Sequence, residues 1–97
     1  MNNSRVLQKY VDESRVYRVD FTDKIEPNDT LDAILSCEGS DPALTVGAAQ
    51  IDGNNVAFRL EDGVVGALYT VCSKVTTQGG DELVGVLAIE IIPDTQV

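Results

Sequence analysis

The sequence predicts an all-β domain, built as a sandwich of about seven short strands. Three observations support this fold class. Runs rich in Val, Ile, Thr and aromatic residues recur along the 97-residue chain, and most alternate apolar with polar positions. Turn-forming sequences separate these runs at intervals of roughly 8–12 residues. The third observation is a tyrosine, Tyr69, that follows a Gly-containing corner.

The expected strands begin after a polar N-terminal segment. In chain order they are residues 15–22, 31–38, 43–46, 48–51, 56–60, 69–76 and 83–92. We expect tight hairpin turns at residues 52–55 and 78–81, because the glycines there adopt positive φ at little steric cost. Pro27 and Pro42 mark two further connections, since proline removes a donor that a strand needs.

Alternation along each strand predicts which side chains face the core. The expected core residues are Tyr17, Val19, Phe21, Val56, Phe58, Leu60, Tyr69, Val71, Val75, Leu83, Leu87, Ile89 and Ile91. The strand at residues 31–38 leaves two alternatives open. Its inward set is either Leu31, Ala33, Leu35 and Cys37, or a bulge shifts the pattern to Ile34.

Tyr69 is expected to be a structural residue. A tyrosine just past a Gly-containing corner, with the small apolar Val71 two positions on, is typical of the tyrosine corner of immunoglobulin-like sandwiches. The hydroxyl group of such a tyrosine can bond a backbone group upstream and close the corner. The predicted fold class is therefore an immunoglobulin-like β-sandwich.

Residues 1–14 form an N-terminal arm that does not look like part of the sandwich, so we divide the chain into this docking arm and a sandwich at residues 15–97. Apolar side chains of the arm fall on one face of a helix, although the segment is too short to hold a helix alone. It is either a frayed terminus or a segment that a partner orders. The arm residues expected to contact a partner are Arg5, Val6, Leu7, Lys9, Tyr10 and Val11.

The last predicted strand carries an apolar row on its outer side. If Glu90 faces water, then Val84, Val86 and Ala88 do so as well, beside Cys72 on the neighbouring strand. Such stripes often mark protein contacts, and we predict that Val84, Val86 and Ala88 belong to a partner interface. The alternative is that the N-terminal arm of the same chain covers them.

Charge and composition exclude several function classes. The net charge is −9, with +2 on residues 1–18 and −11 on the remainder, so a nucleic-acid partner is not expected. The basic arm instead favours an acidic neighbour, which includes another copy of this chain.

The sequence contains no run of 18 apolar residues, so we expect no membrane-spanning helix. Cys37 and Cys72 are expected to be free thiols, because alternation turns Cys72 outward and the compartment is expected to be reducing.

The residues of catalytic and metal chemistry are sparse. The chain contains no histidine, which removes the common triads and the commonest zinc ligand. We therefore expect no enzyme activity, no cofactor and no metal. One acidic series recurs every three residues, and we interpret it as a solvated edge, with calcium binding as the alternative. Its members are Asp20, Asp23, Glu26, Asp29 and Asp32.

Several segments resemble small tailed-phage virion proteins with an immunoglobulin-like fold, the phage fibre–tail adaptors. Residues 9–13 (KYVDE) are similar to the family's K-x-P-x-E, residues 17–21 (YRVDF) to its aromatic-x-aliphatic-Asp-aromatic, and residues 29–31 (DTL) to its D-T-I. Residues 60–71 (LEDGVVGALYTV) are similar to L-x-G-G-x-x-G-x-x-Y-x-V, and residues 75–80 (VTTQGG) to V-T-T-x-x-G. Val11, Asn28 and Asp62 depart from these patterns.

The resemblance implies a non-enzymatic structural part of a phage particle. The expected role is a small adaptor in the tail or neck that links tail or portal-proximal proteins to fibres. A capsid decoration protein is the alternative, followed by a carbohydrate-binding module, for which Tyr10 is the one aromatic not assigned to the core. The expected partners are other virion proteins, including further copies of the chain, in a virion assembled in the host cytoplasm.

Overall fold

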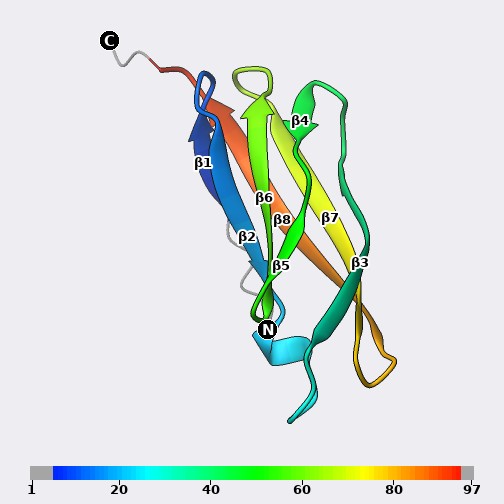
Figure 1. Ribbon diagram of the computed structural model, residues 1–97. Coiled ribbons are helices and arrows are strands. Elements are labelled where there is room, and N and C mark those ends of the chain that lie inside the picture. Colours follow the sequence, from blue (N-terminus) through cyan, green and yellow to red (C-terminus); the bar gives the residue numbers. More distant parts are fainter. Residues whose placement is uncertain (1–5, 95–97) are drawn as a thin grey trace.

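The computed structural model describes residues 6–94, which form two facing sheets of an all-β sandwich (Figure 1). One short 3-10 turn, η1 (Thr22–Lys24), interrupts the strands. The strands are β1 (Val6–Tyr10), β2 (Arg15–Asp20), β3 (Leu31–Gly39), β4 (Leu44–Val46), β5 (Gln50–Asp52), β6 (Asn55–Asp62), β7 (Leu68–Thr77) and β8 (Glu82–Ile92). The predicted fold class is confirmed.

Each sheet has a simple strand order. The first sheet runs β1-β8-β7-β3, and the second runs β2-β6-β4, with β5 also paired to β6. All pairs are antiparallel except β1 with β8, which run in parallel from Val6 opposite Ala88 to Tyr10 opposite Ile92. The first and last strands of the domain therefore lie side by side.

The helical face expected within the N-terminal arm is not formed. Residues Val6–Tyr10 are a strand, because the edge of β8 offers backbone partners that a helix of this length could not supply itself. With a period of two, Leu7 and Lys9 point into the sandwich while Val6 and Tyr10 point out. Arg5 lies outside the described residues.

The core fills the space between the two sheets, as the alternation predicts. Its buried apolar members are Tyr17, Val19, Phe21, Leu31, Leu44, Val56, Phe58, Leu60, Tyr69, Val71, Val75, Leu87, Ile89 and Ile91. Leu83 is half-buried and packs against this cluster. The pattern on β3 follows the bulge alternative: its register with β7 shifts twice, so Ile34 and Cys37 pack on the core while Leu35 is 53% exposed.

Two close contacts hold the layers together. The amide of Val64 donates to the hydroxyl oxygen of Tyr69 at 3.0 Å, which is the predicted tyrosine corner. The second contact is at Gly85 on β8, where an added Cβ atom would lie 2.6 Å from Cγ1 of Val19 and 2.9 Å from Cζ of Phe21. Only a glycine lets β8 approach the opposite sheet this closely.

Candidate docking surface

The outer side of the β1-β8-β7-β3 sheet carries an exposed group of apolar side chains. We call the group Val6, Leu68, Val84, Val86 and Ala88 the apolar face. Val86 and Leu68 are each 61% exposed, and Val84 is 45% exposed. The register places Val6 opposite Ala88 on adjacent strands, and Leu68 lies on β7 opposite Glu90. Aliphatic side chains from three neighbouring strands thus share one side of the sheet.

The strand geometry explains why these residues point outward. On β8, Leu87, Ile89 and Ile91 are buried, and the intervening positions must therefore face water. This is the orientation that the sequence predicts for Val84, Val86 and Ala88. Leu68 was missed, although its position next to the buried Tyr69 on an alternating strand would have identified it.

Charged side chains surround the apolar face. Glu82 and Glu90 lie on β8, and Gln8 of β1 donates from Nε2 to Oε1 of Glu90 at 3.3 Å. Lys74 lies on β7 opposite Val84, and Glu38 of β3 lies opposite Cys72. An apolar centre with a polar, mainly acidic border is the arrangement expected of a protein contact surface.

The other predicted interface residues of the arm divide into two groups. Val6 and Tyr10 are 48% and 41% exposed on the outer side of β1. Leu7 and Val11 instead pack against the core and are only partly exposed. The alternation along β1 therefore leaves Val6 and Tyr10 as the arm residues whose side chains face outward.

Lys9 does not lie on a basic outer surface, which corrects the expectation for this residue. Its side chain is fully buried, and its ammonium group donates to the carbonyl oxygens of Tyr10 at 2.9 Å, Val11 at 3.2 Å and Asp62 at 2.9 Å. These three bonds use all three ammonium hydrogens, as a buried lysine requires. The lysine acts as an internal brace between β1 and the end of β6.

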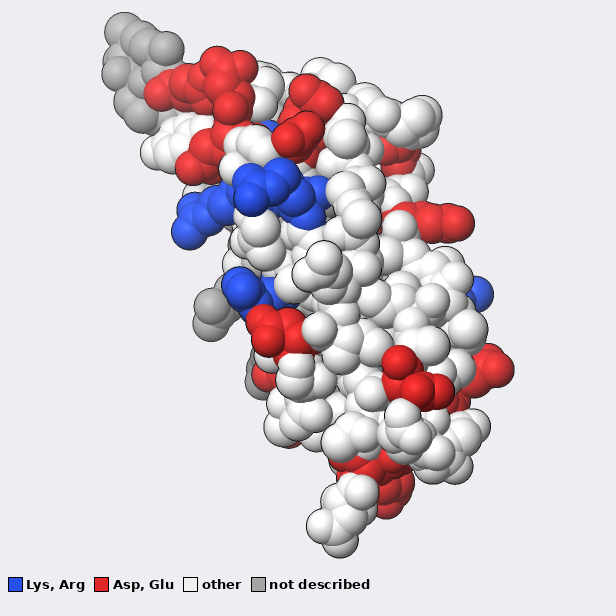
Figure 2. Space-filling view, viewed as in Figure 1, with Lys and Arg blue, Asp and Glu red and all other residues white. Residues whose placement is uncertain are grey.

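The outer side of the β2-β6-β4 sheet carries basic side chains, unlike the mainly acidic border of the apolar face. Figure 2 shows Lys and Arg side chains gathered on the left of this face, over β2 and β6, with acidic side chains at both ends of the molecule. Arg18 pairs with Asp52 at 3.2 Å between Nε and Oδ2. Nη1 of Arg59 donates to the Ser14 carbonyl oxygen at 3.0 Å. These arginines are engaged within the chain.

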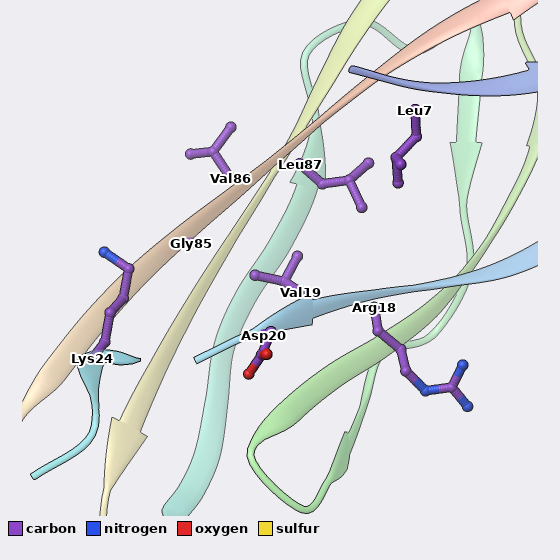
Figure 3. Close-up of a pocket in the computed structure, with 8 residues that line it drawn as sticks. All are labelled: Leu7, Arg18, Val19, Asp20, Lys24, Gly85, Val86 and Leu87. Atoms are coloured by element: carbon purple, nitrogen blue, oxygen red, sulfur yellow. The ribbon is translucent and has the colours of Figure 1, made fainter. Parts of the chain in front are cut away.

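A groove opens between β8 of one sheet and β2 of the other (Figure 3). It has a volume of about 240 Å³ and is lined by Leu7, Arg18, Val19, Asp20, Lys24, Gly85, Val86 and Leu87. In Figure 3, Leu87, Val19 and Leu7 point into the space between the strands, while Val86 points away from it. The groove thus borders the apolar face at Val86, although the side chain of Val86 is directed to the outer side of the sheet.

The acidic series at Asp20–Asp32 does not converge on one point. Asp20 accepts hydrogen bonds from the amide and hydroxyl groups of Thr22, at 2.8 and 2.6 Å, and these bonds lower its pKa. Asp29 accepts from the amides of Thr30 and Gly79, at 2.8 and 2.9 Å. Between residues 6 and 94, the structure has no grouping of three His, Cys, Asp or Glu side chains that could hold a metal ion.

Both cysteines are free thiols in the structure. Sγ of Cys37 lies 3.4 Å from Oγ of Ser73, and burial raises the pKa of the Cys37 thiol. A raised pKa lowers the fraction of thiolate at neutral pH.

One further finding concerns membranes. No helix within the described part of the chain combines the length and the hydropathy needed to cross a bilayer.

The fold and its surfaces define an all-β sandwich whose described residues form an exposed apolar face and a groove between the sheets. Comparison with protein-family models then gives the family. Residues 9–90 match the model described as podophage GP4 fiber-tail adaptor protein gp77, and the chain belongs to this family of phage fibre–tail adaptors. The resemblance inferred from the sequence motifs is thereby confirmed. The comparison with individual curated proteins gives no match.

Proposed function

We propose that this chain is a non-enzymatic virion adaptor that links tail or portal-proximal proteins to fibres, and that the apolar face is one of its docking surfaces. The observation that carries the proposal is the exposure of Val84, Val86 and Leu68 on one side of a sheet in a fibre–tail adaptor. A structural adaptor acts through such surfaces, and its family implies contacts with other virion proteins.

Energetics supports a role in binding for the apolar face. Full burial of an exposed valine or leucine side chain contributes about 1.5–3 kcal/mol, so covering the exposed parts of Val84, Val86 and Leu68 would favour binding. The sheet beneath them is rigid, because β8 is paired with β7 along nine consecutive residue pairs without a register shift. A preordered surface loses little conformational entropy when it binds.

We extend the proposal to the N-terminal arm and to assembly. Val6 and Tyr10 lie on the outer side of β1, beside β8, so a partner that covers Val86 also reaches the arm. Several copies of the chain are proposed to act together in each particle, which assembles in the host cytoplasm. Within the N-terminal arm, we therefore assign the docking role to Val6 and Tyr10, whose side chains face outward.

A carbohydrate-binding role has less support. Sugar sites commonly stack the ligand on exposed aromatic rings, and four of the five aromatic residues are buried in the core. Tyr10 alone is exposed, at 41%, and the described surface places no second ring beside it. The geometry therefore favours a protein partner.

Incorporation into particles tests the proposed docking surface. Phage lacking the gene for this protein would be complemented with a Val86→Glu variant, and the protein in purified particles would be quantified by mass spectrometry. We expect incorporation to fall at least tenfold while circular dichroism shows a folded domain, since Val86 makes no core contact. The loss is equivalent to about 1.4 kcal/mol or more of binding free energy.

The matched control is Val16→Glu on the opposite sheet, where Val16 is 37% exposed on the outer side of β2. This variant should be incorporated at close to the normal level. Equal incorporation of the Val86→Glu variant and the wild-type protein would rule out the apolar face as a docking surface.

A further inference from the structure

The two outer edges of the β1-β8-β7-β3 sheet are built differently. β3 forms one edge, and two register shifts together with the exposed Asp32 and Glu38 disrupt it. Bulges and charges of this kind protect an edge from pairing with other strands. The other edge is formed by β1 and by the part of β8 that β1 does not cover, and neither the β1–β8 nor the β8–β7 pairing has a register shift.

β1 covers only part of the β8 edge. Its pairing begins with Val6 opposite Ala88 and ends with Tyr10 opposite Ile92. Among the strands that the structure describes, none pairs with residues 82–87 of β8 on this side. The backbone groups that point to this side over those residues therefore form an edge without a register shift, which is suited to an added strand.

The groove lies directly beside this segment of β8. Its apolar lining comes from Leu7, Val19 and Leu87, and Gly85 contributes no side chain that would close it. In Figure 3, the lining side chains come from β1, β2, η1 and β8. An extended chain placed at the edge of β8 would direct alternate side chains into this apolar lining and the others to solvent.

Charge at the groove indicates what the added chain carries. Arg18 is paired with Asp52, and Asp20 is bonded to Thr22, so their charges are largely satisfied within the protein. Lys24 also lines the groove, and no carboxylate of the described residues forms an ion pair with it. Its ammonium group is therefore available to an acidic side chain of a ligand.

We infer that residues 82–87 of β8 and the adjoining groove bind an extended segment of a second protein, which adds a strand to the sheet. The segment has apolar side chains at alternate positions, which contact Val19 and Leu87, and an acidic side chain that reaches Lys24. This strand addition goes beyond the proposed role of the apolar face, because it uses the edge of the sheet instead of its outer side.

A designed peptide probes the site without knowledge of the natural partner. The probe is the blocked peptide Glu-Val-Glu-Val-Glu-Val-Glu, titrated into ¹⁵N-labelled full-length protein and followed by amide chemical shifts. The matched probe Lys-Val-Lys-Val-Lys-Val-Lys has the same apolar pattern and the opposite charge. We expect the acidic peptide to shift residues 82–87 and the groove residues of β2, and to slow hydrogen exchange at the β8 edge.

Lys24→Glu should weaken binding of the acidic peptide several-fold. Lys74→Glu, which reverses a lysine on the outer side of β7, should leave it unchanged. Shifts confined to other surfaces, or an absence of binding, would overturn the inference, and so would equal binding of the two peptides. The inference also fails if the amides of residues 82–87 that point to this edge are already protected from exchange without peptide, because the chain's own residues would then occupy it.

This test is independent of the particle experiment. Normal peptide binding by a Leu68→Glu variant that is not incorporated would support both surfaces separately, since Leu68 is the member of the apolar face on β7. Failure of the peptide to bind leaves the incorporation result unaffected, since Leu68 lies on β7, outside both the groove and residues 82–87.

Discussion

The ammonium group of Lys9 and the carbonyl oxygen of Asp62 lie 2.9 Å apart, although 53 residues separate them in the chain. This bond joins β1 of one sheet to the end of β6 in the other. Asp62 has a positive φ of 67° at this point, and Gly63 follows with φ of 100°. The lysine thus bonds the chain where it turns out of β6.

Replacing Lys9 with methionine should destabilise the domain by about 3 kcal/mol, because three carbonyl oxygens would lose their charged donor. Methionine fills a similar volume, so little of the loss would come from a cavity. Urea denaturation followed by circular dichroism measures the change. Lys74→Met, at an exposed site, should change stability by less than about 0.5 kcal/mol. Similar midpoints for the two variants would contradict the proposed brace.

Tyr69→Phe tests the tyrosine corner. The substitution removes the hydroxyl oxygen that accepts from the Val64 amide and keeps the buried ring, so we expect a loss of about 1 kcal/mol. The midpoint of thermal or urea denaturation measures it. Tyr10→Phe is the control, since the Tyr10 ring is exposed on the edge strand. An unchanged midpoint for Tyr69→Phe would mean that the corner bond contributes no stability.

Gly85→Ala tests the close approach of β8 to the opposite sheet. The added methyl group would clash with Val19 and Phe21, and overpacking of this kind costs about 1–3 kcal/mol. Gly47→Ala offers a milder comparison, because the nearest atom to its Cβ would be 3.4 Å away. If both variants unfold at the same denaturant concentration, the approach at Gly85 is less constrained than its geometry indicates.

Asp29 should contribute a pH-dependent part of the stability. Hydrogen bonds from the side chain of Thr77 and from the amides of Thr30 and Gly79 lower the pKa of Asp29 below its ordinary value of 3.8. A carboxylate with a lowered pKa stabilises the folded state above the unfolded pKa, and this contribution is lost as the pH falls through the folded pKa.

The Asp29→Asn variant checks this contribution. It should lose stability at neutral pH and show a smaller further loss below pH 3.8 than the wild-type protein. Denaturation midpoints measured across the acidic range give both values. Parallel curves for the variant and the wild-type protein would show that the carboxylate is not the titrating group.

Much of the fold could be predicted from the sequence because alternation is a local property. Val56, Phe58 and Leu60 are buried as their spacing predicts, and the hairpin turn around Gly53 lies where expected. The sequence left a bulge in β3 as one of two alternatives, since the apolar pattern of this strand was compatible with two registers. Only pairing with β7 selects Ile34.

The candidate site was less accessible to sequence reasoning. The outward orientation of Val84 and Val86 follows from β8 alone and was predicted. The burial of Lys9 depends on a carbonyl group of Asp62, which no local pattern could associate with it. Likewise, the groove forms only where β2 of one sheet passes β8 of the other, and β1 had not been recognised as a strand.

The parallel pairing of β1 with β8 has a mechanical consequence. If a pulling force enters the domain at Val6 and leaves it at Ile92, the two strands are drawn along each other in opposite directions. The hydrogen bonds of all five residue pairs between them then carry the load together in shear, instead of opening one after another. A domain connected in this way transmits tension along its long axis without unzipping.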